Sequence, residues 1–295
     1  MAQTSSFVTA LRGALAVISS AASPPAPRDG ASAESLAPAE ALVARKLVRE
    51  LEQALARFEQ KGPPEADLIS IACHDLKDPL ASIVMGAGFL KKTVPPDDAP
   101  AKRVVEAIIR STDRMSQVIG DFHDLAKLEA GRLVVDLRPW DVVAVLQGAV
   151  ASFEAKAKER NVRFEVHLPA GPLLAVCDRA RLVQVVTKLV ANAVKFTEAE
   201  GRAALRVEAV AKANGGGVRF TVSDTGRGIA PERVEAIFDY AANARRTPRD
   251  GPGLGLPIAQ ALSLLQGSHI DVTSKVDEGS TFTFTLPPPA PARSL

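Results

Sequence analysis

At residues 71–80 the chain reads Ile71-Ala72-Cys73-His74-Asp75-Leu76-Lys77-Asp78-Pro79-Leu80. The stretch reads as part of a helix, and it places an imidazole next to a carboxylate. A histidine with an acid beside it can be deprotonated and made nucleophilic, so that it can accept a phosphoryl group. A His-Asp pair is common in proteins, so its interpretation here depends on the segments that follow it.

Three later segments follow in order. They are Val185-Val186-Thr187-Lys188-Leu189-Val190-Ala191-Asn192-Ala193-Val194-Lys195-Phe196-Thr197, Ser223-Asp224-Thr225-Gly226-Arg227-Gly228-Ile229 and Gly251-Pro252-Gly253-Leu254-Gly255-Leu256. Together with the His-Asp stretch, they resemble the H, N, G1 and G2 boxes of two-component sensor histidine kinases. The resemblance covers residues 65–288 and implies a HisKA-type dimerisation and phosphoacceptor domain followed by a Bergerat-type ATPase domain.

The resemblance implies a role for single residues. His74 is the expected phosphoacceptor, whose ring nitrogen attacks the γ-phosphate of ATP while Asp75 accepts or orients the proton on the other nitrogen. Asn192 is expected to give a carbonyl oxygen to Mg²⁺, and Lys195 to neutralise phosphate charge. Asp224 is expected to accept a hydrogen bond from the adenine amino group.

Glycines and arginines complete the expected nucleotide site. The resemblance makes residues 239–250 a lid over the nucleotide, with Arg245 and Arg246 near the γ-phosphate. A solvated basic loop is the alternative for these arginines. Backbone N–H groups at a helix start can hold phosphate, and glycines let the backbone approach the ligand; the expected positions are Gly226, Gly228, Gly251, Gly253 and Gly255.

Two positions depart from the family pattern. Lys188 stands where the family usually has a second asparagine, and its charge either weakens Mg²⁺ binding or contacts phosphate directly. Asp78 stands where many relatives have Thr or Asn, at the position associated with dephosphorylation of the partner. An ionised aspartate cannot donate a side-chain hydrogen bond and repels a phosphoryl group, so weak phosphatase activity is predicted.

Bulk composition narrows the classes of function. The 36 Lys and Arg residues nearly balance the 34 Asp and Glu residues, which gives no support to nucleic-acid binding. The two cysteines, Cys73 and Cys177, show no pairing pattern and fit a reducing compartment. The longest apolar run, residues 13–22, is too short to span a bilayer. A soluble, cytoplasmic protein is therefore expected.

The first half of the chain predicts helices. Residues 1–64 are expected to hold a linker and an amphipathic or coiled-coil helix over residues 39–60. Two longer helices are predicted over residues 67–92 and 100–130, the second with apolar residues every seven positions, such as Ile108 and Met115. Two antiparallel helices with such stripes cannot bury both faces alone, so residues 65–131 predict a dimeric four-helix bundle.

The remainder of the chain mixes strands with helices. Helices are predicted over residues 142–160, 179–195 and 254–266, with Asp178 as a helix cap. Strands are predicted over residues 133–137, 162–168, 204–211, 218–223, 270–274 and 281–286. Helices that can cover one face of such strands indicate an α/β sandwich over residues 132–288. Residues 289–295 are expected to form a disordered tail.

The favoured interpretation is an ATP- and Mg²⁺-dependent histidine kinase that forms a homodimer. Because no receiver domain is visible, it is expected to pass the phosphoryl group to a separate response regulator. A nucleotide-binding pseudokinase is the first alternative, supported by Lys188 and by an incomplete F box at residues 237–240. An ATPase related to DNA gyrase is the second, and the helix pair that carries His74 argues against it.

Overall fold

The computed structural model describes residues 66–95, 97–211, 216–239 and 253–290, without the side chains of residues 66–72 and 75. The described residues form two compact units, one up to residue 133 and one from residue 134. The helix expected over residues 39–60, the lid residues Arg245 and Arg246, Gly251 and most of the expected tail lie outside the described residues. No helix within these ranges combines the length and apolar character needed to cross a membrane.

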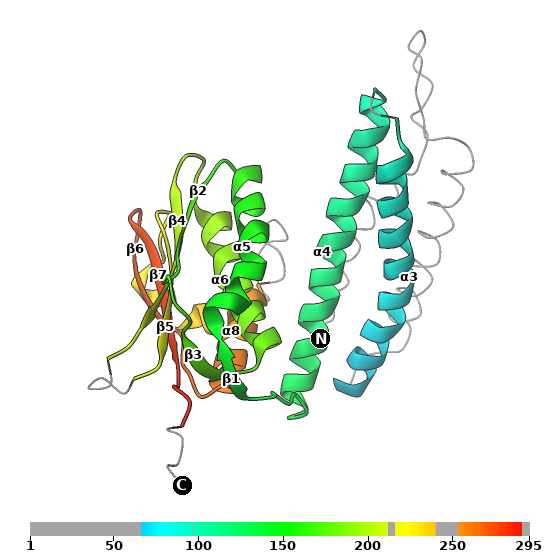
Figure 1. Ribbon diagram of the computed structural model, residues 1–295. Coiled ribbons are helices and arrows are strands. Elements are labelled where there is room, and N and C mark those ends of the chain that lie inside the picture. Colours follow the sequence, from blue (N-terminus) through cyan, green and yellow to red (C-terminus); the bar gives the residue numbers. More distant parts are fainter. Residues whose placement is uncertain (1–65, 96, 212–215, 240–252, 291–295) are drawn as a thin grey trace. The chain divides into compact units, whose positions relative to one another are not determined.

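Helices α3 (Ala66–Thr93) and α4 (Ala99–Glu129) pack side by side as an antiparallel hairpin (Figure 1). Buried residues recur at alternating intervals of three and four, which is the spacing of a coiled-coil seam. In α3 they are Cys73, Leu76, Leu80, Ile83 and Ala87, and in α4 this row is Val105, Ile108, Thr112, Met115, Ile119, Phe122 and Ala126. Four further residues of α4 are buried beside this row: Ser111, Val118, Asp124 and Leu125. The predicted helical hairpin is confirmed.

Local sequence sets both ends of α4. At its start the Asp98 side chain accepts a hydrogen bond from the Ala101 N–H at 2.9 Å. At its end Gly131 has a φ of 63°, a conformation that glycine adopts without steric penalty. The N–H of Arg132 then reaches the carbonyl of Lys127 at 2.9 Å and closes the helix. The helix predicted over residues 100–130 therefore ends within one residue of its expected end.

The second unit contains a five-stranded sheet in the order β2-β4-β5-β7-β6. Its strands are β2 (Arg163–His167), β4 (Arg202–Ala209), β5 (Val218–Asp224), β6 (Asp271–Lys275) and β7 (Gly279–Leu286). The β2–β4 pair is parallel and the other pairs are antiparallel. A separate two-stranded ribbon joins β1 (Arg138–Asp141) to β3 (Leu174–Cys177).

Three helices cover one face of this sheet: α5 (Val142–Glu159), α6 (Arg179–Phe196) and α8 (Gly255–Leu264) (Figure 1). The strands β5 and β7 alternate buried and more exposed side chains, so each presents an apolar row to the helices. Phe220 and Phe284 stack within this core with ring centroids 4.6 Å apart. The expected α/β sandwich is confirmed.

The strand predictions had three kinds of error: one strand was misplaced, one was missed, and β4 and β7 each begin two residues before the predicted start. Residues 133–137 have no regular structure, and the strand follows them as β1. Its partner β3 was not predicted, because four residues are too few to show alternation. β4 begins two residues earlier than predicted, since Arg202 pairs with Arg163 of β2. A strand exists where it finds a partner, and the partner lies far away in the sequence.

Candidate functional site

His74 lies on the exposed side of α3. Its neighbours Cys73 and Leu76 belong to the buried seam, so the helical period turns the imidazole away from α4. Burial raises the pKa of the Cys73 thiol to about 12, against the smaller lowering effect of Lys77. Because the thiolate is the nucleophilic form of cysteine, Cys73 does not compete with His74 as a nucleophile.

The residues that follow His74 stay within the same helix. Asp75 lies in α3, and its side chain is outside the described residues. Asp78 is exposed, and its backbone carbonyl accepts a hydrogen bond from the Ser82 hydroxyl at 3.2 Å. Pro79 also lies inside α3, where it cannot donate the backbone hydrogen bond of a normal helical residue.

Asp224 ends β5 and is half-buried. Its carboxylate accepts a hydrogen bond from the Gly226 N–H at 2.9 Å and another from the Ser280 N–H. Burial nevertheless raises the pKa of Asp224 above its ordinary value, because the two backbone bonds offset desolvation only in part. The site therefore holds a partly desolvated acceptor at the C-terminal end of the central strand β5.

Three glycines surround Asp224, and at each of them a side chain would collide with backbone. A Cβ on Gly226 would overlap the Phe196 carbonyl oxygen, and one on Gly228 would overlap the Lys275 carbonyl oxygen. A Cβ on Gly279 would overlap the carbonyl oxygen of Asp224 itself. Gly228 and Gly279 also have positive φ values of 65° and 112°. The backbones of separate chain segments are thus in direct contact around Asp224.

Hydrogen bonds hold the loop after β5 on two sides. Thr225 and Arg202 exchange bonds, from the Arg202 N–H to the Thr225 hydroxyl and from the Thr225 N–H to the Arg202 carbonyl, both at 2.9 Å. On the other side the Ile229 N–H donates to the Ser274 hydroxyl at 2.8 Å. That hydroxyl donates in turn to the carbonyl of Gly279 at 2.8 Å. The loop is therefore fixed before any ligand binds.

The end of α6 meets the same loop. The guanidinium of Arg227 lies 4.5 Å and the ammonium of Lys195 lies 4.6 Å from the centre of the Phe196 ring. Lys188, Asn192 and Lys195 share one half-buried face of α6, because they are spaced four and three residues apart. The structure thus brings Lys195, and through helical spacing Asn192 and Lys188, to the side of the site where Gly226 lies.

The first turn of α8 has at most two backbone N–H groups for a ligand, those of Gly255 and Leu256, because Pro257 has none and the Ile258 N–H bonds to the Leu254 carbonyl. Within the described residues, Leu254 at the N-cap position makes no side-chain cap, and the first turn contains no acidic residue. Gly253 has a φ of 68°. A Cβ on Gly255 would meet nothing within 4 Å, in contrast to the glycines around Asp224. This helix start is thus open to an anion, and it belongs to a helix that packs against α6.

Direct contacts join only some of the residues predicted for nucleotide binding: Lys195 and Gly226 both meet Phe196, and the Gly226 N–H bonds to Asp224. Asn192 and Lys188 lie further back on α6, and Gly253 and Gly255 lie at the start of α8, which packs against α6. His74, Asp75 and Asp78 lie in the other unit. Sequence reasoning missed Gly279, Ser280 and Phe196 as parts of the site. A glycine after the acidic pair Asp277-Glu278 is a turn signal that marked Gly279; the contacts of Phe196 left no such signal.

The residues of the site fit a magnesium ion that arrives with a nucleotide. No group of three or more His, Cys, Asp or Glu in the described chain is arranged to hold a metal ion. The predicted protein ligand is one amide oxygen, that of Asn192. Magnesium is commonly bound in this way, through one or two protein oxygens together with phosphate oxygens and water.

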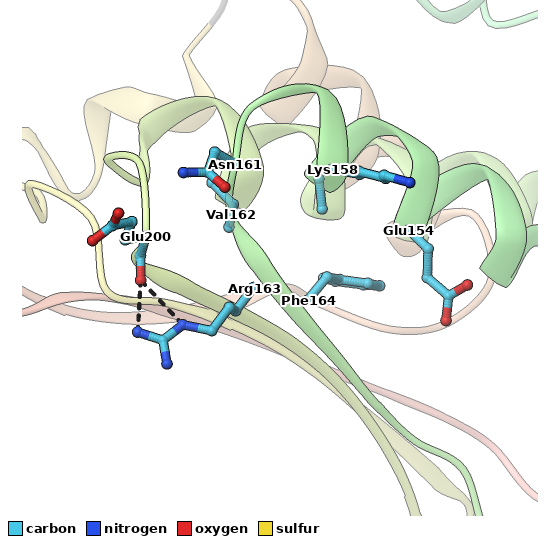
Figure 2. Close-up of a pocket in the computed structure, with 8 residues that line it drawn as sticks. Glu154, Lys158, Asn161, Val162, Arg163, Phe164 and Glu200 are labelled. Atoms are coloured by element: carbon cyan, nitrogen blue, oxygen red, sulfur yellow. Dashed lines mark hydrogen bonds between the residues drawn. The ribbon is translucent and has the colours of Figure 1, made fainter.

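A shallow pocket of about 630 Å³ lies elsewhere, between the end of α5 and the start of β2 (Figure 2). Its lining includes Glu154, Lys158 and Phe164 but none of the residues predicted for nucleotide binding. Arg163 turns its guanidinium to the carbonyl oxygen of Glu200, at 3.0 and 3.2 Å. The polar groups of this pocket do not converge on a common point, so it is not the candidate site.

Each of the two units matches a known family of protein domains. Residues 65–131 match the family model described as the His Kinase A (phospho-acceptor) domain. Residues 177–290 match that of the histidine kinase-, DNA gyrase B- and HSP90-like ATPases. The chain belongs to the histidine kinase family. The order of the two domains, with the phosphoacceptor helices first, distinguishes this family from ATPases that share only the second domain.

Curated relatives of this histidine kinase are longer proteins. It is 31% identical over 246 residues to the circadian input-output histidine kinase CikA of Synechococcus elongatus, covering 81% of this chain and 32% of CikA. It is 30% identical to Drug sensory protein A of Synechocystis, covering 79% of this chain and 36% of that protein. The chain thus spans about a third of these relatives.

A solved structure also matches both units of the chain. The crystal structure of full-length ShkA in complex with AMPPNP matches with a TM-score of 0.60 and 29% identity, over 79% of this kinase and 48% of that chain. The helical hairpin and the α/β sandwich therefore recur in this order in a solved member of the family.

The contrast between the glycines predicts opposite effects of one added methyl group. Gly226→Ala should destabilise the second unit by about 1–3 kcal/mol, because the methyl overlaps the Phe196 carbonyl oxygen. Gly255→Ala should have the same unfolding free energy as wild type, because a Cβ at this position meets no other atom. The variant should still bind ATP more weakly, because the methyl group fills the open space at the start of α8. Urea unfolding followed through Trp140, the single tryptophan, and ATP titration measure the two quantities. Equal stability of the two variants would contradict the packing argument.

Proposed function

We propose that this protein is an ATP-dependent protein-histidine kinase that phosphorylates itself on His74 and then passes the phosphoryl group to an aspartate of a separate response regulator. One observation carries the proposal: a helical hairpin with an exposed histidine accompanies an ATPase-type sandwich in which Asp224 ends β5 among three packing-constrained glycines. Neither half alone would support phosphoryl transfer to histidine.

The nucleotide is assigned to the site around Asp224. The carboxylate accepts a hydrogen bond from the adenine amino group, and Gly226 and Gly228 let the loop after β5 pack against the backbone of Phe196 and Lys275. The uncapped start of α8, with Gly251, Gly253 and Gly255, holds phosphate oxygens, and Lys195 neutralises their charge. Arg245 and Arg246 are further candidates for phosphate contacts. The AMPPNP complex of ShkA supports nucleotide binding in this fold.

Magnesium is the proposed metal, with Asn192 as its protein ligand. When bound, the ion supplies charge stabilisation at the phosphate oxygens. Asn192 and Lys195 are three residues apart on one face of α6 and are both half-buried, so the amide and the ammonium can contact the same triphosphate. The residues of the ATP-binding domain therefore bind the triphosphate and its metal ion by charge and hydrogen bonding, and the nucleophile that reacts comes from the helical hairpin.

In the first step, a nitrogen of the His74 imidazole bonds to the γ-phosphorus of ATP. The bond from this phosphorus to its bridging oxygen breaks, and ADP leaves with the electron pair. Asp75 orients or accepts the proton on the other ring nitrogen. In the second step, the phosphorus–nitrogen bond breaks as a regulator carboxylate bonds to the phosphorus. The exposure of His74 on α3 fits both steps.

We also propose a homodimer built on residues 65–131, the ATP-binding domain over residues 132–288, an N-terminal segment over residues 1–64 and a short tail over residues 289–295. In a single chain, α3 leaves Met85 75% and Phe89 66% exposed. A second hairpin would cover such apolar side chains in a four-helix bundle. The use of ATP and of a response regulator assigns the chemistry to the cytoplasm.

Labelling with γ-³²P ATP tests the proposal. Wild type should acquire acid-labile label, and His74→Ala should lose it completely, because no other nucleophile takes the place of the imidazole. His167→Ala is the matched control, since His167 is exposed on β2 in the other unit, and this variant should label like wild type. ATP binding without label in wild type would favour the pseudokinase, for which Lys188 is the reason.

The raised pKa of Asp224 predicts a pH dependence of nucleotide binding. The carboxylate is the better acceptor, so affinity should fall as the pH drops through this raised pKa. We expect Asp224→Asn to bind ADP about tenfold more weakly near neutral pH, and to lack the fall in affinity that wild type shows as the pH is lowered through the raised pKa of Asp224. Titration of the ADP phosphates is common to both proteins and cancels. Parallel profiles for the two proteins would contradict the role of Asp224.

Asp78 predicts weak phosphatase activity. Its exposed carboxylate lies one helical turn after His74 and repels the phosphoryl group of an incoming regulator. Asp78→Asn should accelerate phosphate release from a phosphorylated regulator in the presence of ADP by about tenfold, a change of ~1.4 kcal/mol in the barrier. Asp97→Asn, an exposed change in the hairpin loop, should have no effect. Rapid release by wild type that disappears in Asp78→Ala would overturn this prediction.

A further inference from the structure

The Asp178 carboxylate joins the start of α6 to the chain that follows the helical hairpin. Its Oδ1 atom accepts the hydrogen bonds that cap α6, from the Ala180 N–H at 2.9 Å and the Arg181 N–H at 3.2 Å. Its Oδ2 atom accepts a hydrogen bond from the Asp136 N–H at 3.0 Å, across 42 positions of sequence. The two oxygens of one side chain therefore have different partners, one in a helix and one in an irregular segment.

Asp178 is itself held in place. Its backbone N–H donates to the Oε1 atom of Gln266 at 3.0 Å, and the Nε2 atom of Gln266 donates to the Leu262 carbonyl of α8 at 3.0 Å. Gln266 is only 2% exposed, so water does not compete for these bonds. The acceptor that meets Asp136 is therefore attached to both α6 and α8, the two helices that carry residues predicted to bind nucleotide.

Two hydrogen bonds bracket the chain that connects the two units. On the hairpin side the Arg132 N–H donates to the Lys127 carbonyl at 2.9 Å. On the side of the ATP-binding domain the Asp136 N–H donates to Asp178. Residues 133–135, called the tether here, lie between these two bonds. The tether is thus three residues long because Asp136 is bonded.

Loss of the bond to Asp178 would lengthen the tether. The next backbone attachment is at Arg138, which begins β1 and pairs with Cys177 of β3. The Asp136 side chain gives no substitute, because it pairs with Arg138 of its own segment at 2.9 Å. The tether would then consist of residues 133–137. At roughly 3.5 Å per residue, the greatest possible distance between the attached backbone positions would rise from about 14 Å to about 21 Å.

We propose that Asp178 is a positioning residue for autophosphorylation, because it keeps the tether at three residues. The inference rests on the proposed function, in which the nucleotide of one domain reacts with His74 of the other. The effective concentration of two tethered groups falls roughly with the −3/2 power of tether length, so a change from three to five residues lowers it about twofold. Asp178 acts through the tether and is assigned no contact with His74 or with the nucleotide.

Asp178→Asn separates the two roles of the carboxylate. Asparagine caps a helix as well as aspartate does, so its one oxygen keeps the bonds to α6. Its amide group is a donor and cannot accept a bond from the Asp136 N–H. We expect the Asp136 amide to exchange with deuterated water about tenfold faster than in wild type, as for loss of one hydrogen bond to a charged acceptor. Mass spectrometry with fragmentation to single amides measures this rate.

Autophosphorylation of the full chain with γ-³²P ATP tests the consequence for catalysis. Asp178→Asn should lower kcat about twofold and leave the KM for ATP unchanged, because the nucleotide site keeps all its residues. Insertion of two glycines between Val134 and Val135 of wild type also gives a five-residue tether. It should lower kcat by the same factor, and it leaves the cap of α6 intact.

Asp141→Asn is the matched control. Asp141 caps α5 and also accepts a hydrogen bond from the Leu173 N–H, and both bonds end on the same oxygen, Oδ1. This variant therefore removes a charge at a helix start and keeps the bonds, so Asp136 exchange and kcat should equal those of wild type.

Three outcomes would contradict the inference or the function beneath it. Unchanged exchange of Asp136 in Asp178→Asn would overturn the attachment. A normal kcat after the glycine insertion would overturn the role of the tether, even if Asp178→Asn were slow. A wild type without label would overturn the proposed function instead, and the exchange of Asp136 would still decide whether Asp178 holds the tether.

Discussion

The backbone around Asp224 is the constraint on which the second unit depends. Asp224 and Gly279 are far apart in sequence, yet the carbonyl oxygen of Asp224 lies where a Cβ on Gly279 would be. Gly226 meets Phe196 in the same way, and Gly228 meets Lys275. Three segments therefore approach one another at distances that only glycine permits. This close approach holds the Asp224 carboxylate, the end of α6 and the loop after β5 together in one site.

Burial of Asp224 gives the site its chemistry as well as its shape. A carboxylate at this position is desolvated, and the N–H groups of Gly226 and Ser280 compensate for only part of the lost hydration. Positive charge gathers on the neighbouring helix, where α6 carries four cations and no acid. A ligand with a hydrogen-bond donor at one end and phosphates at the other matches this arrangement. ATP has both features.

In the first unit, a regular seam separates the core from the reactive residue. Cys73, Leu76 and Leu80 belong to the buried row of α3, and His74 falls on the exposed side. One residue of helical rotation thus decides between a buried thiol with a raised pKa and an accessible imidazole. The same hairpin leaves Met85 and Phe89 exposed, which is the reason for assigning a second chain to it.

The sequence by itself determined the helices of both units, the order of the motifs and the residues that carry them. Periodicity and capping are local properties, so Asp178 and the α4 stripe could be identified without coordinates. Tertiary structure alone decided that Gly226 is required by packing whereas Gly255 leaves open space, that β1 pairs with β3, and that Gly279 belongs to the site. These properties depend on contacts between residues distant in the chain, and no local pattern encodes such contacts.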